Sequence, residues 1–189
     1  MSQIKVVAVS GNPGTPSRTV SLVQRVLDTL AERAHVETHL VEIADVGPRL
    51  GQALTRKALS PAAEATVALV ESAQLLVVGS PTYRATYTGQ FKHLFDLVGY
   101  EALVGTPVIL TATGGSDRHA LLIEHQLRPL FSFFRAFTVP TGIYAVESDF
   151  EDYQVKAPEV TQRVDAAVDE ALRFFPHAVR ASEKLRAIA

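Results

Sequence analysis

Short apolar runs alternate along this chain with longer stretches in which apolar residues recur every three to four positions. The runs are typical of buried parallel strands, and the longer stretches are typical of helices with one buried face. Strands are predicted over residues 4–10, 36–43, 73–80, 106–115 and 139–146. Helices are predicted around residues 20–30 and 91–98 and over about 61–72, 118–136 and 158–175, with a polar connection over 47–60.

This alternation predicts an α/β fold. Five strands with intervening helices favour a doubly wound, flavodoxin-like five-stranded parallel sheet of order 2-1-3-4-5 with helices on both faces. No change of composition, low-complexity stretch or internal repeat divides the sequence, so we expect a single domain over residues 1–189. Its last part, about residues 176–189, is expected to form a helical tail.

Composition narrows the functional classes. The chain has 189 residues and a formal net charge of −2, with 18 basic and 20 acidic side chains mixed along its length. This charge distribution offers no concentrated field for nucleic acid or anionic lipid. The absence of cysteine excludes thiol redox chemistry and a cysteine phosphatase loop. Because no secretory signal and no apolar run of membrane-spanning length is recognised, we expect a soluble, cytoplasmic protein.

The most informative segment is SGNPGTPSRT, residues 10–19, between the first predicted strand and the first predicted helix. Ligands of doubly wound sheets bind at the carboxyl ends of the strands, and N–H groups at a helix N-terminus favour anions. Ser10, Ser17 and Thr19 add hydroxyl groups and Arg18 adds a planar cation, so the segment suits a phosphate. The alternative is a proline-rich turn whose serine or threonine only caps the helix.

Two further loops are expected to meet this one, because the loops after strands one, three and four come together in the predicted order. The loop GSPTYRATY, residues 79–87, contains a rigid proline and tyrosines that can stack on a flat ring system. The loop TATGGSDR, residues 111–118, offers backbone N–H groups that Gly114 and Gly115 make approachable. Such donors suit the edge of a flavin that becomes negative on reduction. Rim tyrosines and a plain glycine turn are the alternative.

Four segments resemble the NAD(P)H-dependent FMN reductases of two-component sulfonate monooxygenase systems. They are SGNPGTPSRT, GSPTYRATYTGQFKHLFDLV, LTATGGSDRHALLIEHQLRPLFSFFRA and GIYA. The resemblance runs over nearly the whole chain and is closest to the methanesulfonate type, although Glu124 stands where that type has aspartate.

The resemblance implies an enzyme that transfers hydride from NADH or NADPH to FMN and supplies reduced FMN to a partner monooxygenase of organosulfur (alkane- or methanesulfonate) metabolism. The flavin N5 accepts the hydride, so no catalytic side chain is implied. The FMN phosphate would be held by Ser10, Ser17, Arg18 and Thr19. The isoalloxazine would be lined by Pro81, Thr82, Tyr83 and Arg84, with Thr113, Gly114 and Gly115 at its pyrimidine edge. The resemblance also implies a homodimer or homotetramer.

His125 stands where the alkanesulfonate-type reductases carry an extra tyrosine that forms a π-bulge at the subunit interface. Independently of the resemblance, Pro129 lacks the N–H group that would bond to the carbonyl of His125. We therefore expect His125 in a helical irregularity packed against a partner subunit near the flavin. The alternative is an ordinary proline-kinked helix.

Two other functions stay open. An FMN-retaining quinone or azo reductase would use the same fold and hydride step, whereas a flavodoxin-like electron carrier would have no catalysis of its own. The near-neutral charge disfavours the carrier, which docks through charge complementarity. No metal site is expected, because His35, Glu37 and His39 share one strand face, and neighbouring side chains on one strand rarely converge on an ion. No motif distinguishes NADH from NADPH.

Overall fold

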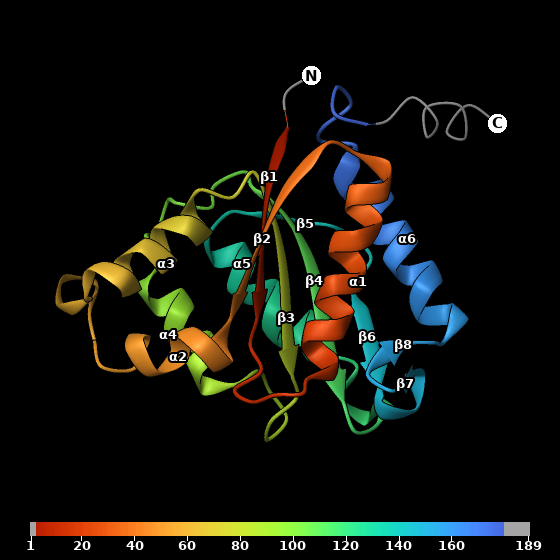
Figure 1. Cartoon of the computed structure of the whole chain (residues 1–189), viewed down its shortest axis with the longest axis horizontal. Helices are drawn as coiled ribbons and strands as arrows, with labels where there is room; N and C mark the ends of the chain where they lie inside the picture. The colour runs from red at the N-terminus through yellow and green to blue at the C-terminus, as the bar shows by residue number, and fades with distance from the viewer. Residues whose placement is uncertain (1–2, 180–189) are drawn as a thin grey trace.

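A computed structural model describes residues 3–179 of the chain. Its central sheet is parallel and has the order β2-β1-β3-β4-β5, with β6 also paired to β4 (Figure 1). The strands are β1 (Ile4–Ser10), β2 (Val36–Glu42), β3 (Leu75–Pro81), β4 (Pro107–Gly114), β5 (Phe137–Thr138) and β6 (Ile143–Val146). The predicted flavodoxin-like α/β fold and its strand order are confirmed.

Helices cover both faces of the sheet (Figure 1). One face carries α1 (Arg18–Arg33) and α6 (Pro158–Leu172), and the other carries α2 (Ile43–Leu50), α3 (Pro61–Glu71), α4 (Gly89–Leu97) and α5 (Arg128–Phe133). Successive side chains of a strand point to opposite faces. Val6 and Ala8 therefore pack with the α1 layer, while Val7 and Val9 pack with the layer that contains Phe91. The continuous apolar runs of the inner strands supply both cores at once.

Two of the expected elements differ from the structure. The polar connection over 47–60 contains the second half of α2 and a short 3-10 helix, Arg56–Ala58. Gly47 and Pro48 conceal α2 in the sequence, but the helix still buries Ile43, Val46 and Leu50. The long helix expected over 118–136 is divided into a 3-10 turn, a π-helical turn (Ile123–Leu127) and α5.

The end of the chain differs from expectation as well. After β6, the acidic stretch over residues 147–152, whose composition alone favours a solvated connection, instead leads through a 3-10 turn into a small hairpin of β7 (Phe150–Glu151) and β8 (Gln154–Val155). The expected tail over 176–189 lies mostly outside the described residues, and within it residues 176–178 form a turn. Among residues 3–179, no helix combines the length and apolar character needed to cross a bilayer.

The fifth strand is interrupted between β5 and β6. Val108 of β4 pairs with Thr138 of β5, and Thr111 of β4 pairs with Ile143 of β6. Between these two pairs, β4 advances by three residues and the fifth strand advances by five. Two extra residues therefore leave the ladder, at a site where Pro140 has no N–H group to offer. Arg128 of α5 compensates by donating to Thr138 Oγ1 at 2.9 Å and to the carbonyl oxygens of Val139 at 2.9 Å and Pro140 at 3.1 Å.

Arg128→Met is expected to lower the free energy of unfolding by about 1–3 kcal/mol, because it leaves these oxygens without their donor. Arg128 also holds the pKa of the Glu124 carboxyl below its ordinary value of 4.5, mainly through their hydrogen bonds. The stabilisation contributed by the Arg128–Glu124 pair is complete above pH 4.5 and is lost as the pH falls below this value. Urea unfolding at pH 7 and at about pH 3.5 should therefore show a smaller difference between variant and wild type at the lower pH.

Arg135→Met serves as the control for this prediction, because Arg135 forms an exposed ion pair with Glu101. It should change the free energy of unfolding by less than about 1 kcal/mol. An Arg128 variant as stable as the Arg135 variant would contradict a role for Arg128 in bridging the interrupted strand.

Candidate binding pocket at the carboxyl edge of the sheet

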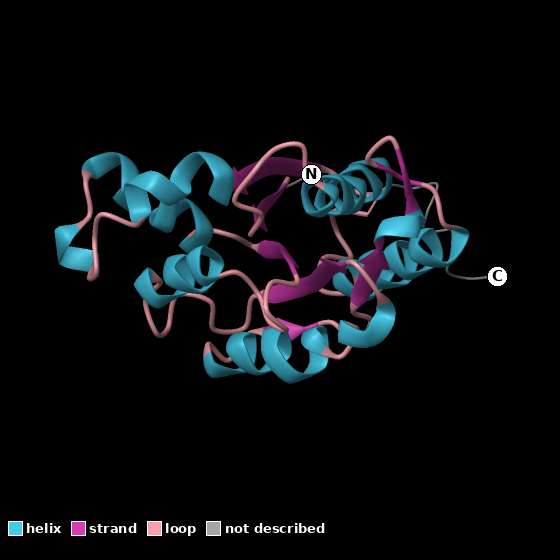
Figure 2. Cartoon of the chain, turned by 90° about the horizontal axis from the view of Figure 1, so that it is seen from below, coloured by secondary structure: helices cyan, strands magenta, loops and turns pink. Residues whose placement is uncertain are grey.

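The loops that follow β1, β3, β4 and β6 surround one pocket of about 280 Å³. Figure 2 views the molecule from below, toward this end of the sheet. The pocket is lined by Asn12, Pro16, Ser17, Arg18, Thr19, Pro81, Thr82, Tyr83, Thr113, Gly114, Gly115, Val146, Glu147, Phe150 and Tyr153. Parallel strands end at a common edge, so loops far apart in the sequence meet there.

One end of the pocket carries groups that can bind an anion. Helix α1 begins here with Ser17 as its N-cap, whose Oγ accepts a hydrogen bond from the N–H of Val20 at 3.2 Å. The remaining N–H groups of a first helical turn have no partner within the helix, and the helix dipole adds positive potential. No acidic residue lies in the first turn of α1, and Arg18 adds a full positive charge.

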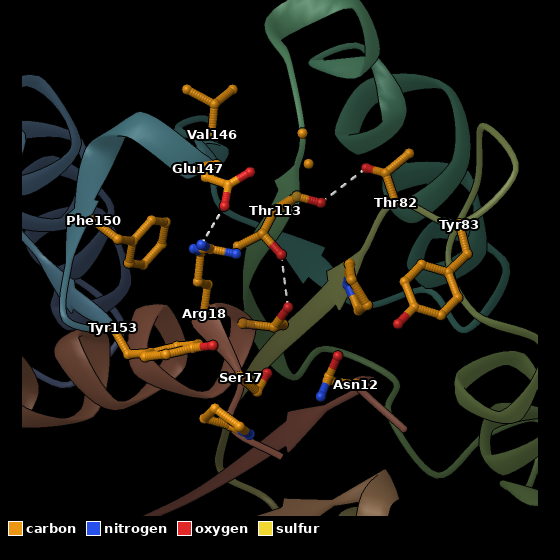
Figure 3. Close-up of a pocket in the computed structure, with 15 residues that line it drawn as sticks. Asn12, Ser17, Arg18, Thr82, Tyr83, Thr113, Val146, Glu147, Phe150 and Tyr153 are labelled. Atoms are coloured by element: carbon orange, nitrogen blue, oxygen red, sulfur yellow. Dashed lines mark hydrogen bonds and ion pairs between the residues drawn. The ribbon is translucent and has the colours of Figure 1, made fainter. Parts of the chain in front are cut away.

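The Arg18 guanidinium already has two neighbours (Figure 3). Its Nη2 donates to Oε1 of Glu147, which follows β6. Its Cζ also lies 5.4 Å from the centre of the Tyr153 ring, at the turn of the β7–β8 hairpin. These contacts hold the cation at the wall of the pocket, on the side where the hairpin lies.

Threonine side chains join the three loops in the middle of the pocket (Figure 3). The Oγ1 atoms of Thr19 and Thr113 lie 2.6 Å apart, and both residues are buried. The carbonyl oxygen of Thr113 accepts hydrogen bonds from the N–H of Thr82 at 2.7 Å and from its Oγ1 at 3.0 Å. These contacts fix the first turn of α1, the end of β4 and the loop after β3 relative to one another.

The glycine turn after β4 depends on Tyr144 of β6. The Tyr144 hydroxyl donates to the carbonyl of Ser116 at 2.8 Å. A Cβ atom at Gly114 would lie 1.9 Å from that hydroxyl oxygen, whereas one at Gly115 would meet nothing within 4 Å. Burial raises the pKa of Tyr144 above its ordinary 10.0, so the hydroxyl stays protonated and can donate. Only a glycine at position 114 lets the turn lie this close to the phenol.

The rim opposite Arg18 is a tight turn in the loop after β3. Tyr83 and Thr86 exchange backbone hydrogen bonds of 2.8 and 3.2 Å. The two residues between them, Arg84 (φ 51°) and Ala85 (φ 69°), adopt the left-handed conformation that side chains disfavour. Backbone strain of this kind persists where the surrounding structure requires it, often at a binding site. The turn leaves Tyr83 49% exposed at the mouth of the pocket.

Most of the residues predicted for the site come together here. The predicted residues that line the pocket are Ser17, Arg18, Thr19, Pro81, Thr82, Tyr83, Thr113, Gly114 and Gly115. Ser10 lies outside the lining, buried at the end of β1, and its Oγ has no partner among the described residues. Arg84 is exposed and also lies outside the lining. The binding roles of all these residues, Ser10 and Arg84 included, stay predictions.

Two other sequence candidates lie away from the pocket lining. His125 is exposed within the π-helical turn Ile123–Leu127, where the N–H of Arg128 bonds to the carbonyl of Ile123 five residues back. Its contact with a partner subunit stays a prediction. Glu37 and His39 form a hydrogen bond of 2.9 Å, and no group of three potential metal ligands is gathered within residues 3–179.

Four lining residues at or beyond the end of the fifth strand were not predicted: Val146, Glu147, Phe150 and Tyr153. The acidic stretch after β6 indicates a solvated connection when it is considered alone. The predicted topology could have placed these residues in the pocket, because a fifth parallel strand beside β4 must end at the same edge as the other strands. Asn12 and Pro16 lie within the loop that the sequence had already singled out.

Residues 4–151 match the family model for NADPH-dependent FMN reductase. The chain belongs to this family. It is thereby an NAD(P)H:FMN oxidoreductase. One relative, the NADH-dependent FMN reductase SfnE of Pseudomonas putida, is 49% identical over 181 residues, which are 95% of this chain and 97% of the relative. The FMN reductase (NADPH) of Pseudomonas aeruginosa is 45% identical over 174 residues, 92% of this chain and 94% of the relative.

Solved structures agree with this assignment. The apo form of an NADH:FMN oxidoreductase, EmoB, superposes with a TM-score of 0.78 at 29% identity and covers 90% of each chain. A WrbA-like flavodoxin protein from Agrobacterium tumefaciens superposes with a TM-score of 0.63 at 16% identity, covering 91% of this chain and 99% of the other. The second likeness shows the flavodoxin-like fold alone.

Proposed function

We propose that this FMN reductase takes hydride from NADH or NADPH and releases reduced FMN to a separate monooxygenase of alkane- or methanesulfonate metabolism. The observation that carries the proposal is the pocket with a cationic helix N-terminus at one end and a glycine turn at the other. The likeness to the NADH-dependent FMN reductase SfnE over 95% of the chain supports FMN as the substrate that is reduced.

The lining suits FMN chemically. Ser17, Arg18 and the first turn of α1 would hold the phosphate, because they combine a cation with N–H and hydroxyl donors. The ring system would lie between Tyr83 and the turn of Gly114 and Gly115, whose small size lets a flat ligand approach the backbone. The cavity of about 280 Å³ encloses part of the ligand, and the exposed rim at Tyr83 leaves the ring accessible to a nicotinamide.

When bound, FMN supplies a hydride acceptor at its N5 atom. The chain's own task is then to align two nucleotides. The Thr19–Thr113–Thr82 contacts hold the three loops in register, and the glycine turn presents backbone donors to the pyrimidine edge. The pocket lining includes no histidine, and the proposal assigns no acid or base to a side chain.

The proposal includes a homodimer or homotetramer. The π-helical turn and the segment before it display Leu121, which is 63% exposed, and His125 on the surface. We propose that these residues contact a partner subunit, since π-helical turns are found mostly at functional places. We also propose a cytoplasmic location, because NADH and NADPH are available there.

The kinetic behaviour of FMN tests the proposal. Flavin-free protein is expected to oxidise NADH or NADPH only after FMN is added, with an initial rate that saturates as FMN is varied. The loss of nicotinamide absorbance measures this rate. A protein that retains its flavin and reduces quinones at a rate independent of added FMN would instead be a quinone or azo reductase. No nicotinamide oxidation in the presence of FMN would indicate an electron carrier.

A further inference from the structure

Glu147 is placed in the pocket by a well-held turn. It begins the 3-10 turn Glu147–Asp149 directly after β6, and Asp149 Oδ2 accepts a hydrogen bond from the N–H of Val146 at 2.7 Å. The Glu147 side chain is 65% exposed and forms an ion pair with Arg18. Figure 3 shows its carboxylate directed at the guanidinium.

In the proposed binding mode, the FMN phosphate and the Glu147 carboxylate both bind the Arg18 guanidinium. Guanidinium groups bind carboxylates and phosphates through the same planar set of N–H donors. A phosphate monoester carries roughly −1.5 to −2 charges near neutral pH. A phosphate bound at Arg18 must therefore either displace Glu147 or lie beside a like charge, and both reduce its net affinity.

The hairpin after Glu147 does not depend on this ion pair. Strands β7 and β8 pair with each other, and Glu151 forms its own ion pair with Lys156. The carbonyl oxygen of Asp149 also accepts a hydrogen bond from the N–H of Lys156 at 2.8 Å. The Arg18–Glu147 contact is thus a separate feature, which faces the pocket.

We propose that Glu147 is an internal competitor for the FMN phosphate, and that its carboxylate sets how tightly the flavin binds and how fast it leaves. This inference rests on the proposed function and deepens it. An enzyme that hands reduced FMN to another protein has to release it, and a built-in anion at the phosphate site favours release without changing the contacts to the ring. Because Glu147 acts on the phosphate, its charge should not affect the affinity for riboflavin, which has no phosphate.

Glu147→Gln tests the proposal, because it removes the charge and keeps the shape. The dissociation constants of FMN and of riboflavin are measured by flavin fluorescence, and the release of FMN is measured by stopped flow. The variant is expected to bind FMN about three- to fivefold more tightly than wild type and to release it correspondingly more slowly. Riboflavin affinity should change by less than about twofold.

Glu151→Gln is the matched control. It removes the same charge four residues further along the chain, in the hairpin, where Glu151 pairs with Lys156 and does not line the pocket. Its affinity for FMN should stay within about twofold of wild type. Glu147→Ala, as a second variant, should shift FMN affinity in the same direction as Glu147→Gln.

Three results would overturn the inference: unchanged FMN affinity in the Glu147 variants, weaker FMN binding, or an equal gain for riboflavin. Weaker binding would mean that Glu147 orients Arg18 for the phosphate instead of competing with it. The proposed function is judged separately by turnover of the wild type. Normal FMN reduction with unaltered affinity in Glu147→Gln rejects only the role of Glu147, whereas a wild type that reduces no FMN rejects the function.

Discussion

Arg18→Ala is expected to weaken FMN binding by about 10- to 100-fold. A hydrogen bond to a charged group contributes about 1.5–3 kcal/mol, and each 1.4 kcal/mol is a factor of ten in the dissociation constant. The variant also leaves the Glu147 carboxylate without its partner beside the incoming phosphate. Fluorescence titration with FMN measures the effect, and the Michaelis constant for FMN should rise in parallel.

The comparison with riboflavin makes this prediction specific. Riboflavin binding should change far less than FMN binding, because Arg18 lies at the N-terminus of α1, the proposed phosphate end. Lys156→Ala is the control, since it removes an exposed cation on the nearby hairpin that does not line the pocket. Equal losses for both flavins, or no loss for FMN, would show that the phosphate is held elsewhere.

Gly114→Ala should disrupt the turn that the proposal assigns to the flavin ring. The new Cβ atom would lie 1.9 Å from Tyr144 Oη, 3.0 Å from Tyr144 Cζ and 3.3 Å from Thr82 Oγ1. Either the turn or the phenol must move, and overpacking of this kind costs about 1–3 kcal/mol. We expect a lower melting temperature and a loss of most FMN reductase activity, measured by thermal unfolding and by nicotinamide oxidation.

Two further variants isolate the cause. Gly115→Ala adds the same methyl group one residue later, where nothing lies within 4 Å, and should leave the melting temperature almost unchanged. Tyr144→Phe removes the clashing hydroxyl oxygen, so the double variant Gly114→Ala/Tyr144→Phe should recover part of the stability lost by Gly114→Ala. If Gly114→Ala and Gly115→Ala both leave the melting temperature almost unchanged, the close approach of Tyr144 is not the reason that position 114 requires glycine.

Much of the pocket could be predicted because its chemistry is local to each loop. The apolar runs indicate buried parallel strands, and residues at or beyond the carboxyl ends of these strands, such as Arg18, Thr82 and Thr113, must then lie at one edge of the sheet. All three line the pocket. The helix irregularity near His125 has a local cause as well, because Pro129 cannot donate a backbone hydrogen bond.

Other features follow no local pattern. Helix α2 contains Gly47 and Pro48, yet it forms because Ile43, Val46 and Leu50 are buried against neighbouring elements. The interruption of the fifth strand also depends on a distant residue, since the bonds of Arg128 compensate for the missing ladder contacts. Tertiary packing outweighed local propensity in both places.

The sequence by itself determined the order of strands and helices, the residues of the first loop that we propose to bind the phosphate, and the family resemblance. Only the tertiary structure decided that Arg18 meets Glu147, 129 residues away, and that Tyr144 lies against Gly114. The physical reason is that an ion pair or a steric contact depends on the register of β6 beside β4 and on the path of the chain after it. That register is set by packing across the whole sheet rather than by neighbours along the chain.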